Sequence, residues 1–407
     1  MYKVAFSIGL VALSVIWWKS IDVHPTIGNI SDFLKSYEYI VETHQVQTED
    51  GYILTMHRIP EGRNEVPKNT KKPAVFLMHG LLLSSIDWVI KGPEKAVGLI
   101  LADAGYDVWI GNYRGNTCSR KHLNLDPIRD KEAFYNSSYH EIGIYDIPAM
   151  VDYVLEHTGQ AKLSYIGFSQ GVTSFLVMGA LRPEYNEKIL IMNAWAPVTN
   201  MHATSSFIFN TLRKFPYVLK VIELLKWYEM FDITTAPAFR FICRSSSFIC
   251  DGLFGLLGSS DEQMPDKNFQ LAALSNFPSG MSLKQLSHYV QGSISGIFAP
   301  YNRNFSNVKK SDSYDLAKVT APMIFYYGEE DNLVNHVRLL EYLRDLNGVT
   351  CLQVLLNEVI KDIPNVKKIY RVPYRGFNHL DFLWGKDVQL LNEETLKNIN
   401  YFNENFY

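Results

Sequence analysis

Cysteine is scarce in this chain, and charges of the two signs nearly balance. The 407 residues include four cysteines, whose spacing has no zinc-site pattern. Lysine and arginine number 39 against 42 aspartates and glutamates, which gives a formal net charge of −3. This balance argues against a basic surface for nucleic acid and against a polybasic membrane anchor. No internal repeat or low-complexity segment is visible.

The apolar run near the N-terminus is short for a membrane span. Lys3 precedes an apolar run over residues 4–18, and the polar Lys19 and Ser20 follow. A spanning helix needs about 20 residues. A positive start, a short apolar stretch and a polar exit are typical of a secretory signal peptide, which we expect over residues 1–20. A single membrane anchor is the alternative.

The composition is that of a large globular protein. Hydrophobic residues make up 47 % of the chain and charged residues 20 %, which is enough apolar material for a sizeable core. The length alone would fit two or three domains, although enzymes built on one large sheet often have this length.

Two further features agree with secretion into an oxidising compartment or a lysosome. Asn29, Asn136 and Asn304 each begin an Asn-x-Ser tripeptide and are candidate glycan acceptors. Cys243 and Cys250 are close enough in sequence to close a small disulfide loop. Two free buried thiols are the alternative, and the residues alone leave both open.

Short apolar runs alternate with helical patterns through much of the chain. A helix is expected over residues 143–157, and another over 172–181. The expected strands are 52–59, 74–78, 106–110, 163–166, 189–192, 323–327 and 369–372. Strands that alternate with helices imply right-handed crossovers and a mostly parallel sheet in an α/β fold.

The alternation stops over residues 199–319. This stretch is rich in Phe, Leu and Tyr and is too long for a loop, so we expect a mainly helical cap inserted between core segments 21–198 and 320–407. Its aromatic residues would either present an apolar surface to a lipid-like substrate or form the core of the cap itself.

A candidate nucleophile lies on the turn after strand 163–166. Gly167-Phe168-Ser169-Gln170-Gly171 fits Gly-x-Ser-x-Gly, and the helix 172–181 follows it. A serine on a tight strand-to-helix turn has an exposed hydroxyl, and flanking glycines allow the strand and helix to approach closely. The motif and its context predict that Ser169 is a nucleophile.

A serine nucleophile needs a general base, and the base needs a carboxylate. On this kind of turn the chain order is Ser, acid, His. Asp331 follows strand 323–327 and His379 follows strand 369–372, so both should lie at the carboxyl edge of the sheet with Ser169. We predict His379 as base and Asp331 as acid. The competing acids are Glu329, Glu330 and Asp381.

An attack on an ester also needs N–H donors for the oxyanion. The N–H of Gln170 directly follows the nucleophile, and that of Leu81 lies on the loop after strand 74–78. We predict these two groups as donors. His79 precedes this loop, and its position favours a role in holding the loop over a role as base.

At this point the residues resemble the acid lipases of the α/β-hydrolase superfamily, a family with gastric, lysosomal and insect members. The resemblance runs in family order over nearly the whole chain beyond residue 20. The matching segments are Asp50-Gly51-Tyr52-Ile53-Leu54 with Arg58-Ile59-Pro60, His79-Gly80-Leu81-Leu82 with Ser84-Ser85 and Asp87-Trp88, Asn112-Tyr113-Arg114-Gly115-Asn116-Thr117, Gly167-Phe168-Ser169-Gln170-Gly171, Ala196-Pro197-Val198, Pro278-Ser279-Gly280-Met281-Ser282 and Phe377-Asn378-His379-Leu380-Asp381-Phe382-Leu383-Trp384.

The resemblance implies an α/β-hydrolase fold and a serine lipase that acts at a lipid–water interface on triacylglycerols or steryl esters. The family's triad falls on Ser169, Asp331 and His379, and its oxyanion donors on Leu81 and Gln170. A cap disulfide between Cys243 and Cys250 is also implied. The resemblance implies no metal or cofactor, and no obligate protein partner is evident.

Three positions depart from the family pattern. Phe168 stands where histidine is common, and Ile86 replaces an acidic residue. Residues 346–369 form a longer stretch than expected, and the part around Cys351 is either a genuine insertion or an error in the gene sequence. Because this stretch separates Asp331 from His379, it could disturb the base. Two rival functions stay open, namely a lipid-binding relative without catalysis and an esterase for short soluble esters.

Overall fold

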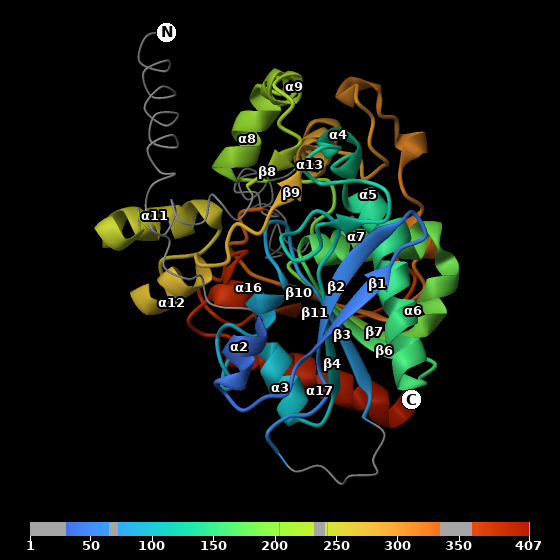
Figure 1. Ribbon diagram of the computed structural model, residues 1–407, viewed down its shortest axis with the longest axis vertical. Helices are drawn as coiled ribbons and strands as arrows, with labels where there is room; N and C mark the ends of the chain where they lie inside the picture. The colour runs from blue at the N-terminus through green and yellow to red at the C-terminus, as the bar shows by residue number, and fades with distance from the viewer. Residues whose placement is uncertain are drawn as a thin grey trace, which may run out of the picture.

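A nine-stranded sheet forms the centre of the protein in a computed structural model that describes residues 30–64, 72–202, 204–231, 241, 243–333 and 360–406 (Figure 1). The strand order is β1-β2-β4-β3-β6-β7-β10-β11, and β5 pairs with β2. The strands are β1 Glu42–Gln47, β2 Tyr52–Ile59, β3 Ala74–Met78, β4 Asp107–Gly111, β5 Lys121–His122, β6 Leu163–Phe168, β7 Ile189–Trp195, β10 Met323–Tyr327 and β11 Val366–Arg371.

The sheet is mostly parallel, as predicted. From β4 through β11 every neighbouring pair is parallel, whereas β2 is antiparallel to β1, β4 and β5. The connection between β1 and β2 is a short turn closed by Gly51, which can join only antiparallel strands. All seven expected strands are present, and β2, β3 and β10 have the expected bounds. The strand order and the helices on both faces agree with the predicted α/β fold.

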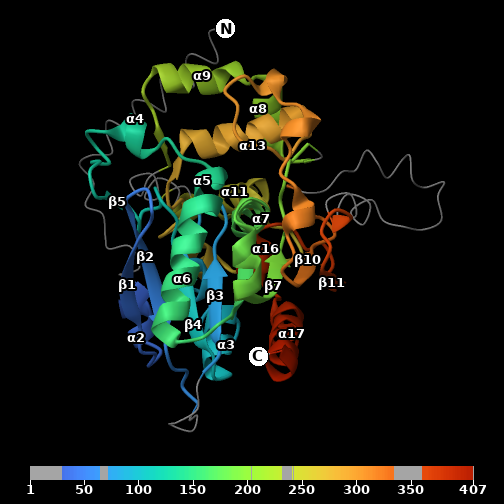
Figure 2. The ribbon, with the colours of Figure 1, turned by 90° about the vertical axis from the view of Figure 1, so that its right-hand side faces the viewer.

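Helices cover both faces of the sheet (Figures 1 and 2). Along β3, Phe76 and Met78 belong to the core cluster under α6 and α7, and Val75 and Leu77 to the cluster under α3 and α17. The helices are α2 Ile30–Lys35, α3 Val97–Asp103, α4 Lys131–Phe134, α5 Tyr139–Glu141, α6 Ile147–Thr158, α7 Gln170–Leu181, α8 Phe207–Lys214, α9 Tyr217–Leu224, α11 Ser247–Leu257, α12 Lys267–Ala273, α13 Leu283–Ser295, α16 Asp381–Trp384 and α17 Gln389–Phe406.

The helix predicted over 143–157 differs at its start. Residues Ile142–Asp146 form a π-helical turn, and the α-helix α6 begins at Ile147. A Cβ atom on Gly143 would lie 2.7 Å from the carbonyl oxygen of Ser174, so this turn packs directly against the backbone of α7. The wider turn accompanies a contact that only glycine permits, and such a contact is not visible in a helical pattern.

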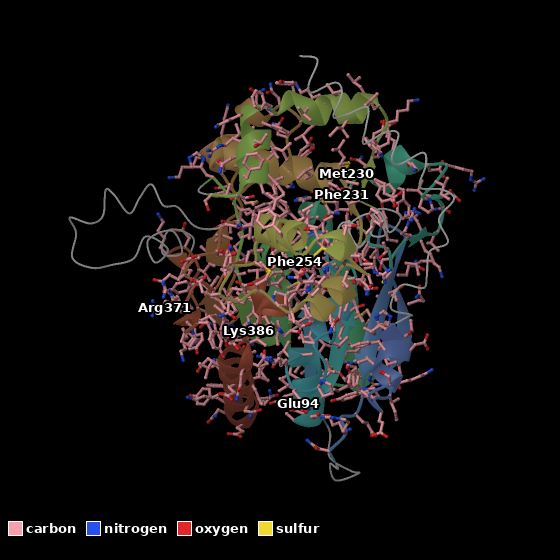
Figure 3. The ribbon with its side chains drawn as sticks, turned by 90° about the vertical axis from the view of Figure 1, so that its left-hand side faces the viewer. Glu94, Met230, Phe231, Phe254, Arg371 and Lys386 are labelled. Carbon is pink, nitrogen blue, oxygen red and sulfur yellow. A yellow bond between two sulfur atoms is a disulfide. The ribbon has the colours of Figure 1, made fainter. Side chains whose placement is uncertain are left out.

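The 199–319 segment is largely helical where the structure describes it. α8, α9 and α13 lie beyond the carboxyl ends of the parallel strands (Figure 2). A two-stranded sheet of β8 (Glu229–Met230) and β9 (Met281–Ser282) lies beside them. α11 and α12 lie to one side (Figure 1). Cys243 and Cys250 form a disulfide with an S–S distance of 2.05 Å, so the bonded alternative is confirmed. Cys250 lies on α11 with Phe254, which is labelled in Figure 3.

A buried arginine joins the β1–β2 turn to the core. The Arg114 side chain, which is 2 % exposed, contacts Asp146 at 2.6 Å and Asp50 at 2.8 Å. Its guanidinium also lies 4.0 Å from the centre of the Tyr52 ring. Burial raises the pKa of Asp146, against the opposing effect of Arg114. The charge of Arg114 therefore offsets the cost of burying the charged Asp146 carboxylate.

We predict that Arg114→Met lowers the free energy of unfolding by about 3–5 kcal/mol, because it leaves Asp146 buried without its counter-charge. Arg129→Met is the matched control, since Arg129 is 82 % exposed and pairs with Asp126 at the surface, where a pair contributes about 0–1 kcal/mol. Denaturant unfolding measures both. An equal effect of the two substitutions would contradict the prediction.

Candidate active site

Ser169 lies on a strained turn between β6 and α7. Its φ of 52° and ψ of −112° are unusual for a residue with a side chain. The flanking glycines make the turn possible. A Cβ atom on Gly171 would lie 2.2 Å from the carbonyl oxygen of Met78, and one on Gly167 would lie 2.8 Å from the carbonyl carbon of Gly171. Close backbone approach therefore holds Ser169 at the carboxyl edge of the sheet.

Ser169, His379 and Asp331 form one hydrogen-bonded chain. Nε2 of His379 lies 2.8 Å from Oγ of Ser169, and Nδ1 lies 2.9 Å and 3.0 Å from the two carboxylate oxygens of Asp331. All three side chains are buried. With the proton on Nδ1, the imidazole donates to the carboxylate and accepts from the serine hydroxyl. This arrangement can remove the serine proton as the oxygen attacks.

The competing acids have other surroundings. Oδ2 of Asp381 accepts hydrogen bonds from the N–H groups of Asn378 and Ser260. Glu329 pairs with Arg371 at the surface, and Glu330 is exposed. Of the four candidate acids, the structure brings only Asp331 into hydrogen-bond contact with His379. The part of the chain around Cys351 lies outside the described residues, and His379 is nevertheless within range of Ser169.

The loop after β3 lies directly against Ser169. A Cβ atom on Gly80 would lie 3.0 Å from Cβ of Ser169 and 2.8 Å from Cδ1 of Phe168. Within the part of the chain that the structure describes, the N–H groups of Leu81 and Gln170 have no acceptor. Leu81 follows Gly80 and Gln170 follows Ser169, so the two predicted N–H donors lie next to the two residues that make this contact. Both N–H groups are therefore available to bind an oxyanion.

His79 contacts the loop after β3, and its ring does not hydrogen-bond to Ser169. Its Nδ1 donates to the carbonyl oxygen of Gly80 at 2.8 Å, and its ring packs on Tyr113 with centroids 4.1 Å apart. Tyr113 donates to the same carbonyl at 2.7 Å. Burial lowers the pKa of His79 to about 3, so the ring stays neutral in all but strongly acidic solution. These contacts support the predicted loop-holding role.

Phe168 packs beside His379 and leaves its hydrogen bond to Ser169 intact. Its ring centroid lies 5.1 Å from that of His379 and 6.2 Å from that of Phe382. Ile86 is buried in the core under α3. Both departures from the family pattern are thus accommodated as packing residues.

Two sets of contacts at the site were not predicted from the sequence. Asn378 and Asp381 belong to the segment that matches the family pattern, but the bonds of their side chains to neighbouring loops had no signal in the sequence. Gly258 lies far away in sequence, but a Cβ atom on it would lie 3.2 Å from Cβ of His379. Contacts of this kind depend on how separate loops meet.

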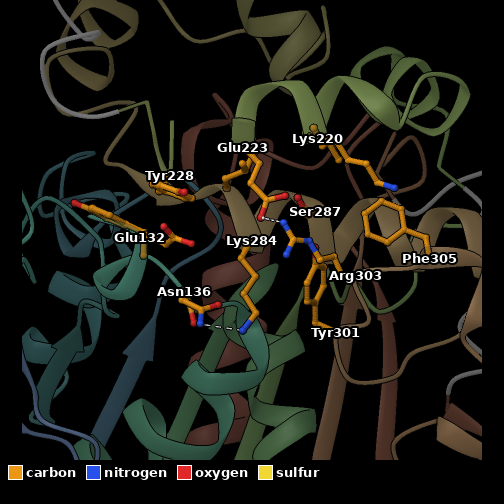
Figure 4. Close-up of a pocket in the computed structure, with 13 residues that line it drawn as sticks. Glu132, Asn136, Lys220, Glu223, Tyr228, Lys284, Ser287, Tyr301, Arg303 and Phe305 are labelled. Carbon is orange, nitrogen blue, oxygen red and sulfur yellow. Dashed lines mark hydrogen bonds and ion pairs between the residues drawn. The ribbon is translucent and has the colours of Figure 1, made fainter. Parts of the chain in front are cut away.

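A cavity of about 220 Å³ lies apart from the triad, between α4, α9 and α13 (Figure 4). Its wall is mixed in character, with tyrosine rings beside the ion pair of Arg303 with Glu223 at 2.7 Å. Lys284, which also lines it, pairs with Glu141 at 2.8 Å. Ser169, Asp331 and His379 do not line this cavity.

Comparisons with known proteins agree with this geometry. A family described as a partial alpha/beta-hydrolase lipase region matches residues 30–92, and one described as alpha/beta hydrolase fold matches residues 73–219. Lipase 1 of Drosophila melanogaster is 38 % identical over 371 residues, which cover 89 % of this chain and 77 % of that protein. Gastric triacylglycerol lipase of Bos taurus is 33 % identical over 88 % of each chain.

A solved structure also shares the fold. It is a putative lipase from Sulfolobus solfataricus, with a TM-score of 0.55 and 16 % sequence identity over 94 % of this chain and 97 % of that one. At this identity the likeness bears on the fold alone.

We predict that Gly80→Ala slows covalent labelling of Ser169 by a fluorophosphonate about 100-fold or more, because the new methyl group forces the Leu81 N–H away from the nucleophile. Gly252→Ala is the matched control, since a Cβ atom there meets nothing within 4 Å. Equal labelling rates for the two variants would refute the placement of the loop.

A second prediction concerns pH. The pKa of His79 is about 3 in the folded chain and about 6.5 when unfolded, so unfolding takes up a proton between these values. Its contribution to stability is complete above pH 6.5 and is lost as pH falls, by on the order of 3 kcal/mol at pH 4.5. His79→Phe lacks this proton uptake. Its stability should therefore fall less than that of the wild type between pH 7.5 and 4.5, and parallel unfolding curves would contradict this.

Proposed function

This chain belongs to the lipase family of the α/β-hydrolase fold, and we propose that it hydrolyses triacylglycerols with Ser169, His379 and Asp331 as its triad. Its relatives are lipases, so the chain is an ester hydrolase. One observation carries the proposal of the triad. The Ser169 hydroxyl, the His379 imidazole and the Asp331 carboxylate are linked by hydrogen bonds of 2.8–2.9 Å in a buried site.

The geometry supports a two-step mechanism. Oγ of Ser169 attacks the ester carbonyl carbon while Nε2 of His379 takes its proton, and Asp331 stabilises the imidazolium. The N–H groups of Leu81 and Gln170 hold the oxyanion. His379 then protonates the departing glyceride oxygen, leaving an acyl group on Ser169. Water attacks this acyl-enzyme with His379 again as base, and the fatty acid leaves.

We propose that the 199–319 segment is the inserted cap. Its exposed residues support an action at a lipid–water interface. Several of its large apolar side chains are exposed, including Phe248 at 87 %, Leu224 at 81 % and Phe207 at 72 %. Others, such as Phe254, are buried, and the Phe254 ring lies 5.5 Å from that of Trp384 outside the segment. Exposed apolar residues gathered on α8, α9 and α11 are costly in water and favourable against lipid.

We further propose that the protein is exported, either out of the cell or to a lysosome. The Cys243–Cys250 disulfide supports an oxidising compartment. Asn136 and Asn304 are exposed and stay candidate glycan acceptors, whereas Asn29 and the expected signal peptide over 1–20 lie outside the described residues. Among the helices that the structure describes, none is long and apolar enough to span a membrane.

The test compares wild type, Ser169→Ala and the control Ser174→Ala on tributyrin and triolein emulsions. Ser174 is a buried serine of the same helix whose hydroxyl has no partner among the described residues. We expect Ser169→Ala to lower hydrolysis at least about 1,000-fold, and Ser174→Ala to leave it within about twofold.

The outcomes separate three functions. Turnover of triolein that depends on Ser169 supports the lipase. Turnover confined to tributyrin would overturn the triacylglycerol substrate in favour of a short-chain esterase. Lipid binding without turnover that depends on Ser169 would overturn the triad and favour an inactive lipid-binding relative.

A further inference from the structure

The loop that carries His379 is fastened to the loop that carries Asp331 by one side-chain oxygen. Oδ1 of Asn378 accepts a hydrogen bond from the backbone N–H of Asn332 at 2.9 Å and another from the N–H of His379 at 2.7 Å. Asn332 directly follows Asp331 in the chain. This amide oxygen, together with a backbone hydrogen bond from the N–H of Glu330 to the carbonyl oxygen of Phe377 at 3.1 Å, spaces the backbone of the acid relative to that of the base.

A second side chain fastens the same loop to a third segment, which lies between α11 and α12. Asp381 is buried, and its Oδ2 accepts from the N–H of Asn378 at 2.8 Å and from the N–H of Ser260 at 3.2 Å. The N–H of Leu380 donates to the carbonyl oxygen of Gly258 at 2.8 Å. Because Gly258 also lies directly against His379, the 258–260 segment forms a wall on one side of the base.

We propose that Asn378 and Asp381 are positioning residues for His379, which hold its imidazole in line with Asp331 and Ser169 by joining three separate loops through backbone N–H groups. The inference rests on the proposed function, because it assigns the support of the same base. Neither side chain touches the reacting atoms. Asn378 acts between the acid and base loops, and Asp381 acts between the base loop and the 258–260 segment.

The triad needs such support because Asp331 and His379 lie on loops beyond the ends of the paired strands. β10 and β11 pair along their length, but Asp331 and His379 lie four and eight residues beyond the strand ends. A displacement of about 1 Å at a catalytic group can slow a reaction about 100-fold. The side chains of Asn378 and Asp381 accept hydrogen bonds from four backbone N–H groups. These bonds fix the backbone on both sides of His379.

The environment of Asp381 indicates which substitution is conservative. Burial raises the pKa of Asp381 to about 7, and the nearby charge of Asp331 acts in the same direction. The carboxyl group therefore takes up a proton near neutrality, and asparagine resembles its neutral form. Asp381→Asn keeps an acceptor oxygen for the two N–H groups, whereas Asp381→Leu has a similar volume and no acceptor.

The experiment compares Asn378→Leu, Asp381→Leu and Asp381→Asn with the wild type in the full-length protein. Asn186→Leu is the control, because Asn186 is also a buried asparagine that joins separate segments, through bonds to Gly179, Lys318 and Ala321. Thermal unfolding reports the stability of each variant, and tributyrin hydrolysis reports kcat and KM separately. Proton NMR follows the strongly downfield signal of the proton between Nδ1 of His379 and Asp331.

We expect Asn378→Leu and Asp381→Leu to lower kcat about 100-fold with KM within about twofold, and to weaken or shift the downfield proton signal. Asp381→Asn should restore kcat to within about fivefold of the wild type, since it keeps the acceptor. Asn186→Leu should lose comparable stability while kcat stays within about twofold of the wild type, because its partners lie away from the base loop.

Equal kcat values for the two leucine variants and Asn186→Leu would overturn the inference. If Asn378→Leu fails to fold, the pair Asp381→Leu and Asp381→Asn decides it alone, and equal loss of kcat in both would overturn it. A wild type without turnover that depends on Ser169 would overturn the proposed function instead. The NMR signal then decides the positioning role by itself, since an unchanged signal in the leucine variants contradicts it.

Discussion

The close approach of backbone to backbone around Ser169 is the constraint on which the site depends. Gly171 lies where any side chain would strike the carbonyl oxygen of Met78, and Gly80 lies where a side chain would strike Ser169. These contacts draw β3, β6 and α7 together at one point of the sheet. The positive φ of Ser169 is the cost of that approach, and the packed sheet around the turn keeps it in place.

Parallel strands then bring the other groups to the same edge. β3 leads to the loop of Leu81, β10 to Asp331 and β11 to His379. Parallel strands place these loops at the same edge of the sheet, and hydrogen bonds between loops set the distances. The sheet thus brings the loops to one edge, and a set of buried polar contacts orients the imidazole of His379 there.

The 199–319 segment contributes exposed apolar side chains to the surface and also contacts the loop that carries His379. Its helices α8, α9 and α11 expose apolar side chains, while the chain just after α11 touches the base loop at Gly258 and Ser260. A single segment therefore combines the surface suited to lipid with the wall beside His379. The cavity between α4, α9 and α13 lies apart from this contact and has a mixed polar lining.

The sequence by itself determined seven strands of the sheet and the turn that carries Ser169, because continuous apolar runs and the Gly-x-Ser-x-Gly pattern are encoded by neighbouring residues. It also predicted which histidine and which acid follow the right strands. Only the tertiary structure placed the carboxylate of Asp331 against His379 and that of Asp381 on other N–H groups, bonded Cys243 to Cys250, and gave Asn378 its two N–H partners. The physical reason is that a local pattern specifies local backbone, whereas hydrogen bonds between loops depend on how distant segments meet after folding.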